Sequence, residues 1–223
     1  MTKLLKTIGQ SLYPYGIFRA GREYSSYSHS PLVYLTFDDG PIPEVTPKVL
    51  DILAKYNIKA TFFMVGENID KYPGIFAQVV QDGHSIGNHT YNHLKGWNTP
   101  FDQYMANVHQ WEDTVRKNLS TIPNPQSPIT NLFRPPYGKA SFLQRRVLHR
   151  LGYRIIYWDV LTRDYDASVT PEHMLEKIKR QVRPRSIINF HDSLKSNERM
   201  LEVLPKAIEW LSQQGYSFAT ITA

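Results

Sequence analysis

The stretch PLVYLTFDDGPIPEVTPKVLDILAKYNIKATFFMV, residues 31–65, contains the pattern that decides the fold. It begins with a short apolar run over residues 33–37, which predicts a buried strand. Thr46 and Pro47 then predict a helix start, with an N-cap followed by proline at the first helical position. Apolar residues continue at helical spacing, and residues 61–65 form a second strand-like run. A strand, a helix and a strand in this order predict one parallel unit.

The same alternation continues to the end of the chain. Further strands are expected over residues 85–88, 132–134, 154–158, 186–190 and 217–221, and further helices over residues 75–80, 100–115, 142–151, 170–182 and 200–211. About seven strands with six helices predict an α/β fold, a single closed or nearly closed barrel of mainly parallel strands. An open doubly wound sheet is the structural alternative. The sequence has no glycine-rich phosphate loop, so no nucleotide site is expected.

Length and composition favour one domain. The chain has 223 residues, and 41% of them are hydrophobic. We expect residues 1–30 to form a basic, amphipathic extension and linker, and residues 31–223 to form the domain. Gly9 and Pro14 interrupt the apolar residues of the extension, so neither a signal peptide nor a transmembrane segment is expected. The protein is therefore expected in the cytoplasm, or at the membrane periphery with its N-terminus touching lipid.

Charge and cysteine content narrow the chemistry. The net charge is +6, but the lysines and arginines are scattered and no nucleic-acid motif is present, so no nucleic-acid partner is expected. Cysteine is absent, which excludes disulfides, thiolate zinc sites and a cysteine nucleophile. A bound metal would therefore need histidine or carboxylate ligands.

Polar residues gather just after the predicted strands. They are Asp38 and Asp39, His89 and His93, Arg134 and Tyr137, Asp159 and Asp164, and His191 and Asp192. The carboxyl ends of parallel barrel strands open on one face, where active sites are built. We therefore expect these side chains to converge there.

His89 and His93 are spaced i, i+4, and on one helical turn they would face the same way and could share an ion. Imidazoles suit zinc and related ions, and a carboxylate can supply a third ligand. The adjacent Asp38 and Asp39 strengthen this hypothesis, because one carboxylate can bind the ion while the other acts as a base. The same Asp-Asp-Gly-Pro sequence also suits a turn.

Five stretches resemble, in order, the motifs of the polysaccharide deacetylases, the NodB-homology enzymes of carbohydrate esterase family 4. These stretches are Thr36-Phe37-Asp38-Asp39-Gly40-Pro41, His84-Ser85-Ile86-Gly87-Asn88-His89-Thr90-Tyr91-Asn92-His93, Arg134-Pro135-Pro136-Tyr137-Gly138, Asp164-Tyr165 and Ile187-Ile188-Asn189-Phe190-His191-Asp192. The resemblance implies a distorted (β/α)7 barrel. It also implies metal-dependent removal of an acyl group from an amide, usually N-acetylglucosamine in a polymer or glycan.

The resemblance also assigns roles. Asp39, His89 and His93 would hold a divalent metal, Zn²⁺ in the first place, with Co²⁺, Ni²⁺ or Mn²⁺ as alternatives. Asp38 would be the general base that deprotonates the metal-polarised water. His191 would protonate the departing amine.

Three more residues would support the chemistry. The backbone N–H of Tyr137 would stabilise the oxyanion together with the metal. Arg134 would pair with Asp38 and keep it ionised, and Asp164 would hold His191 and raise its pKa.

Two residues depart from the family pattern. Asn189 stands where the family usually has Leu, and strand alternation places it on the same side as His191, facing the site. Tyr165 replaces a Trp of the groove wall. Both are expected to contact substrate. Asn189 is expected to alter the choice of acyl group, whereas Tyr165 shortens one groove wall and adds a hydroxyl. Hydrolysis of a small non-sugar amide or cyclic imide, or a non-catalytic glycan-binding module, are the alternative functions.

Overall fold

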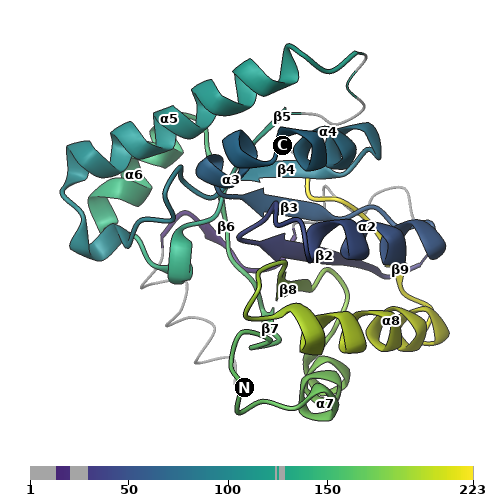
Figure 1. The fold of residues 1–223 in the computed structure, drawn as a ribbon. Coiled ribbons are helices and arrows are strands. Elements are labelled where there is room, and N and C mark those ends of the chain that lie inside the picture. The colour runs from purple at the N-terminus through teal and green to yellow at the C-terminus, as the bar shows by residue number, and fades with distance from the viewer. Residues whose placement is uncertain (1–13, 21–29, 124, 126–128, 223) are drawn as a thin grey trace.

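The computed structural model describes residues 14–20, 30–123, 125 and 129–222, which form a curved sheet flanked by helices (Figure 1). The strands are β1 (Gly16–Ile17), β2 (Leu32–Asp38), β3 (Thr61–Met64), β4 (Ser85–Asn88), β5 (Ile129–Phe133), β6 (Arg154–Ile156), β7 (Val160–Leu161), β8 (Ile187–His191) and β9 (Ser217–Phe218). The helices are α2 (Thr46–Lys55), α3 (Gly66–Lys71), α4 (Pro73–Gln81), α5 (Phe101–Leu119), α6 (Phe142–Arg150), α7 (Pro171–Gln181) and α8 (Asn197–Gln213), with 3-10 turns η2 (Gly96–Asn98) and η3 (Pro136–Gly138).

The sheet confirms the predicted α/β fold with parallel strands. Its order is β1-β6-β5-β4-β3-β2-β8-β7, with β9 paired to β2, and the named strand pairs are all parallel. In Figure 1, helices α4, α2, α8 and α7 follow one another down one side of the sheet, and α5 crosses above it. None of the described helices is long and apolar enough to cross a bilayer.

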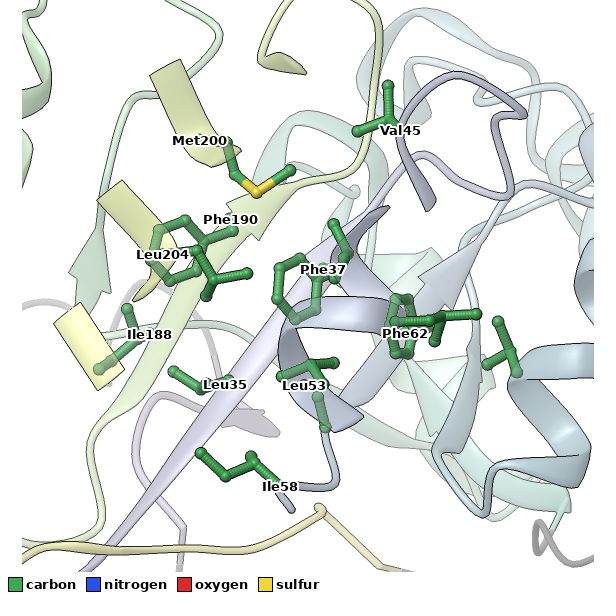
Figure 2. Packing of buried hydrophobic residues seen from close by; sticks show 14 of the residues in the cluster. Leu35, Phe37, Val45, Leu53, Ile58, Phe62, Ile188, Phe190, Met200 and Leu204 are labelled. Carbon is green, nitrogen blue, oxygen red and sulfur yellow. The ribbon is translucent and has the colours of Figure 1, made fainter. Parts of the chain in front are cut away.

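Alternation along the strands separates a helix-facing core from the inner side of the curved sheet. Phe37 of β2 stacks between Phe62 of β3 and Phe190 of β8, with ring centroids 5.0 and 5.7 Å away, in the core shown in Figure 2. Leu53 of α2 and Leu204 of α8 belong to the same buried cluster. Burial of this cluster fixes the register, because a one-residue slip would turn its members to the other face.

The inner face carries the polar residues. Tyr34 belongs to the cluster on this face, and the residues two and four further along β2 are Thr36 and Asp38. In β8, Asn189 and His191 alternate with the core residue Phe190 in the same way. The register pairs Asp38 directly with His191 across β2 and β8, so the sheet itself brings these two residues together.

Four details differ from the sequence expectations. Val45, not Thr46, is the N-cap of α2, and the Thr46 hydroxyl donates instead to Asp192 Oδ2 over 2.6 Å. Helix α3 and strand β7 were not expected. Strand β1, which pairs with β6, comes from the stretch assigned to the extension. The amphipathic segment at residues 4–12 lies outside the described residues.

Candidate metal centre and active site

Three side chains predicted as metal ligands converge at the carboxyl end of the sheet. Asp39 follows β2, while His89 and His93 follow β4. Asp39 Oδ1 lies 3.5 Å from His89 Nε2 and 3.2 Å from His93 Nε2, and one ligand atom from each residue lies within 4.8 Å of the others. Two imidazole nitrogens and one carboxylate oxygen form a donor set that suits zinc and related first-row ions.

The local environment of these atoms also fits a cation. Asp39 Oδ1 is shielded from solvent and makes no hydrogen bond within the part of the chain that the structure describes. Burial works to raise the pKa of Asp39, but the imidazoles of His89 and His93 hold that pKa well below its usual range. His89 Nδ1 lies 2.7 Å from the carbonyl oxygen of Arg134, which fixes the ring and leaves Nε2 available to an ion.

The spacing of His89 and His93 suggested a helical turn, but the two residues lie in a loop. Strand β4 ends at Asn88, and the chain then turns through left-handed conformations at Thr90 (φ 63°) and His93 (φ 56°). Asn88 Oδ1 accepts a hydrogen bond from Thr90 N over 2.8 Å and stabilises this turn. A tight loop therefore brings the two imidazoles together, with ring centroids 5.0 Å apart.

A second carboxylate, that of Asp38, is buried in a dense polar network. It lies beside Asp39, His89 and His93, which are called the metal trio below. Arg134 Nη1 donates to Asp38 Oδ1 (2.6 Å), Asn189 Oδ1 (2.5 Å) and Thr36 Oγ1 (2.8 Å). Asn189 Nδ2 in turn donates to Asp38 Oδ2 over 3.1 Å. The carboxylate is thus held on both oxygens, and the Arg134 charge compensates its burial.

Asn189 occupies a deeper position than strand alternation suggested. Its side chain is on the inner face, as expected, but it is fully buried and contacts Asp38 and Arg134. The cavity wall includes Asp38 and His191 but not Asn189. Asn189 therefore bridges Asp38 and Arg134 from below.

His191 ends β8, the strand paired with β2 on the side away from β3 and β4, and Asp164 follows β7. Asp164 accepts hydrogen bonds from His191 Nδ1 over 2.8 Å and from the His191 backbone N–H over 2.7 Å. Burial opposes the charged imidazole, but the Asp164 carboxylate, helped by Asp39 and Asp38, raises the pKa of His191 to about 9. His191 is therefore held in the protonated form that a general acid needs near neutral pH.

The side chains of Asp38, Asp39, His89, His93 and His191 line one cavity of about 680 Å³. Its walls include the side chains of Tyr137, Trp158, Tyr165 and Leu194. The Tyr137 ring packs against the His93 imidazole with centroids 4.6 Å apart, and the Tyr165 ring meets His191 edge-on at 4.9 Å. The predicted residue Tyr165 thus lies in the wall beside His191.

Two further residues support the site: Asn68, which was not expected there, and Asp192, which was expected on this face but was given no role. Asn68 of α3 donates from Nδ2 to the Asp39 carbonyl oxygen over 2.8 Å. Asp192 accepts a hydrogen bond from Gly40 N over 3.0 Å. The sequence holds no signal for Asn68, because no periodicity indicates α3. Asp192 does have a signal, because it is a polar residue next to His191 at the end of a predicted strand.

Comparisons with known proteins give a consistent result. A family model described as polysaccharide deacetylase matches residues 26–156. A peptidoglycan-N-acetylglucosamine deacetylase of Bacillus cereus is 33% identical over 190 residues, which are 85% of this chain and 66% of that protein. A chitooligosaccharide deacetylase of Azorhizobium caulinodans is 37% identical over 166 residues, 74% of this chain and 76% of that protein. The crystal structure of the Bc1960 peptidoglycan N-acetylglucosamine deacetylase matches with a TM-score of 0.82 and 29% identity, covering 96% and 94% of the two chains.

Proposed function

Because the chain belongs to the polysaccharide deacetylase family, hydrolases of N-acetyl amide bonds, we propose that it removes acetyl groups from N-acetylglucosamine-type residues of a glycan. The observation that carries this proposal is the convergence of a His-His-Asp trio, a separate carboxylate and a carboxylate-bound histidine on one cavity. This set combines a metal site, a base and an acid, which metal-assisted amide hydrolysis uses together.

The family is metal-dependent, and we propose Zn²⁺ as the ion held by Asp39, His89 and His93. When bound, the ion would polarise the acyl oxygen and lower the pKa of water towards ~7. The two histidines and one carboxylate leave coordination positions for water and substrate, as in catalytic zinc sites. Co²⁺, Ni²⁺ and Mn²⁺ accept the same donors.

Asp38 is the proposed general base. Asp38 lines the cavity and is the chain neighbour of the proposed metal ligand Asp39. Its carboxylate forms an ion pair with Arg134, and we do not propose it as a metal ligand. The proton of the attacking water would pass to Asp38, while hydrogen bonds from Arg134 and Asn189 hold its carboxylate in place. The backbone N–H of Tyr137 would donate to the oxyanion that forms on the acyl oxygen.

His191 is the proposed general acid. An amine is a poor leaving group unless its nitrogen gains a proton as the C–N bond breaks. His191 lines the cavity with Asp164 on its Nδ1 atom, which leaves Nε2 to donate that proton. The raised pKa of His191, about 9, keeps the ring charged at neutral pH.

A sugar substrate suits the cavity walls. Tyr137, Tyr165 and Leu194 are exposed large hydrophobic side chains beside the catalytic groups. Such walls, with a few convergent polar groups, are typical of sites that bind organic ligands. The relatives named above act on peptidoglycan and chito-oligosaccharides, which both contain N-acetylglucosamine, and this supports the proposed substrate class.

The test is a turnover assay of the zinc-loaded protein with chito-oligosaccharides and with peptidoglycan glycan chains. We expect acetate release from at least one glycan, loss of activity with a chelator, and recovery when zinc is added back. Turnover of simple amides or cyclic imides by the metal-loaded protein, with no acetate from either glycan, would contradict the proposal. Bound metal without any hydrolase activity would indicate a glycan-binding module instead.

A further inference from the structure

Four exposed side chains form a basic aromatic ledge at the edge of the cavity. The ledge consists of Lys95, Trp97, Tyr137 and Lys139. The Tyr137 ring belongs to the cavity wall and packs on His93, while Trp97 meets Tyr137 edge-on with centroids 5.7 Å apart. Trp97 does not line the cavity itself, so the ledge extends the site away from the metal trio.

The ledge is built from two loops that are fastened together. Trp97 lies in η2, next to Gly96, whose carbonyl oxygen accepts a hydrogen bond from Gln144 Nε2 over 2.8 Å. A Cβ at Gly96 would lie 2.9 Å from the carbonyl oxygen of Lys139, so the two loops touch through their backbones. The Thr99 hydroxyl closes the first loop by donating to the Lys95 carbonyl oxygen over 2.8 Å. The four side chains therefore project from a fixed base.

The two lysines have no acidic partner among the residues that the structure describes. Instead, Lys139 Nζ lies 4.9 Å from the centroid of the Trp97 ring, and Lys95 Nζ lies 5.5 Å from that of Tyr137. Cation–π contacts at exposed sites are weak. Two ammonium groups that flank exposed rings are thus available to an anion, since a carboxylate pairs more strongly with an ammonium group than a ring face does.

We infer that the ledge is a second sugar subsite, and that it selects a carboxylate-bearing sugar next to the residue that loses its acetyl group. This inference rests on the proposed function. A glycan whose N-acetyl group reaches the metal trio past Tyr137 places its adjoining sugar over Trp97. A carboxylate substituent on that sugar would lie between Lys95 and Lys139. The preferred substrate is then an acidic glycan rather than a neutral one.

A matched pair of substrates tests the charge requirement. One is a glycan that alternates N-acetylglucosamine with a carboxylate-bearing sugar, and the other is the same glycan with its carboxylates converted to neutral amides. For Lys95→Gln/Lys139→Gln we expect kcat/KM on the acidic glycan to fall about tenfold, mainly through KM, and to stay within about twofold on the amide form. The wild-type preference for the acidic glycan should shrink at high salt.

The matched control is Lys48→Gln/Lys55→Gln, which removes two exposed lysines from α2, one of them resting on a tyrosine ring 5.4 Å away. It should leave both kcat/KM values unchanged. Trp97→Ala should raise KM for both glycans, because stacking does not depend on charge. An equal effect of the ledge variant on both glycans, or no effect on either, would overturn the inference.

A binding measurement separates this inference from the proposed function. Calorimetry with Asp38→Asn protein measures affinity for the two glycans without turnover. Tighter binding of the acidic form, lost in the Lys95→Gln/Lys139→Gln background, supports the ledge even if the wild-type protein releases no acetate. Equal affinity for the two forms contradicts the ledge even if acetate is released from both.

Discussion

Asp192 accepts a hydrogen bond from Gly40 and thereby stabilises the loop that carries the proposed metal ligand Asp39. The Gly40 backbone N–H donates to Asp192 Oδ1 over 3.0 Å, and the Asp192 backbone N–H donates to the Asp38 carbonyl oxygen over 3.0 Å. Asp192 therefore contacts both chain neighbours of Asp39. Asp39 itself has a φ of 85°, in the left-handed region that residues with a side chain rarely adopt. The strained ligand conformation is maintained by these contacts from the loop after β8.

Removing the Asp192 side chain should lower the affinity of the site for its metal. We expect Asp192→Ala to lower metal affinity about ten- to a hundredfold, the range found when the residues that support metal ligands are lost. Asp192→Asn should keep most of the affinity, because its side-chain carbonyl can still accept from Gly40. Titration with Co²⁺, followed by its visible spectrum, measures both. Equal losses in the two variants would contradict the role of the Gly40 contact.

Gly40 should tolerate no side chain. A Cβ at this position would lie 2.0 Å from Asp192 Oδ2, inside a buried cluster where Thr46 also bonds Asp192. We expect Gly40→Ala to lower the free energy of unfolding by about 1–3 kcal/mol, as overpacking does. Denaturant unfolding measures this. Gly74→Ala is the control, because nothing lies within 4 Å of the Cβ position there.

Activity at high pH should depend on Asp164. The general acid works when His191 is protonated, so kcat/KM falls as the pH rises through the pKa of His191, which Asp164 helps to raise to about 9. Asp164→Asn removes that charge, and the basic limb of the pH profile should move to lower pH, towards the usual histidine value of ~6.5. A basic limb that stays in place would show that another group limits activity there.

Asn189 should contribute to stability rather than to acyl selection. Asn189→Leu removes the acceptor for Arg134 and the donor to Asp38, both buried. We expect the free energy of unfolding to fall by about 1–3 kcal/mol, the cost of unsatisfied buried polar groups. Metal content and the relative rates on acetyl and longer acyl substrates should not change. A shift towards longer acyl groups would show that Asn189 reaches the substrate.

The parallel α/β fold and the convergence of most of the polar residues could be predicted from the sequence, for a physical reason. Apolar runs such as residues 33–37 and 61–65 are buried on both faces of a parallel sheet, so they are distinct in the sequence. The residues after them then share one end of the sheet. Asp38, His89 and His191 lie at the ends of three different strands, and they line one cavity as this reasoning predicts.

The missed features depend on tertiary contacts. Helix α3 has only six residues and starts at Gly66; it packs on α5, and its Asn68 bonds the Asp39 backbone. The loop that joins His89 to His93 uses left-handed residues, which spacing alone does not reveal. Alternation gave the correct face for Asn189, but its depth is set by Arg134, which directly follows another strand, β5.

We propose that Asp39 binds the metal and that the adjacent Asp38 stays unligated as the base. Zinc titration of three proteins tests this assignment most directly. Calorimetry of the wild type and of Asp38→Asn should each give one bound ion with similar affinity, whereas Asp39→Ala should lose the high-affinity site. The Asp38→Asn protein should then bind zinc but release no acetate. Equal loss of zinc from Asp38→Asn and Asp39→Ala would contradict the account, because it would make Asp38 a ligand rather than a free base.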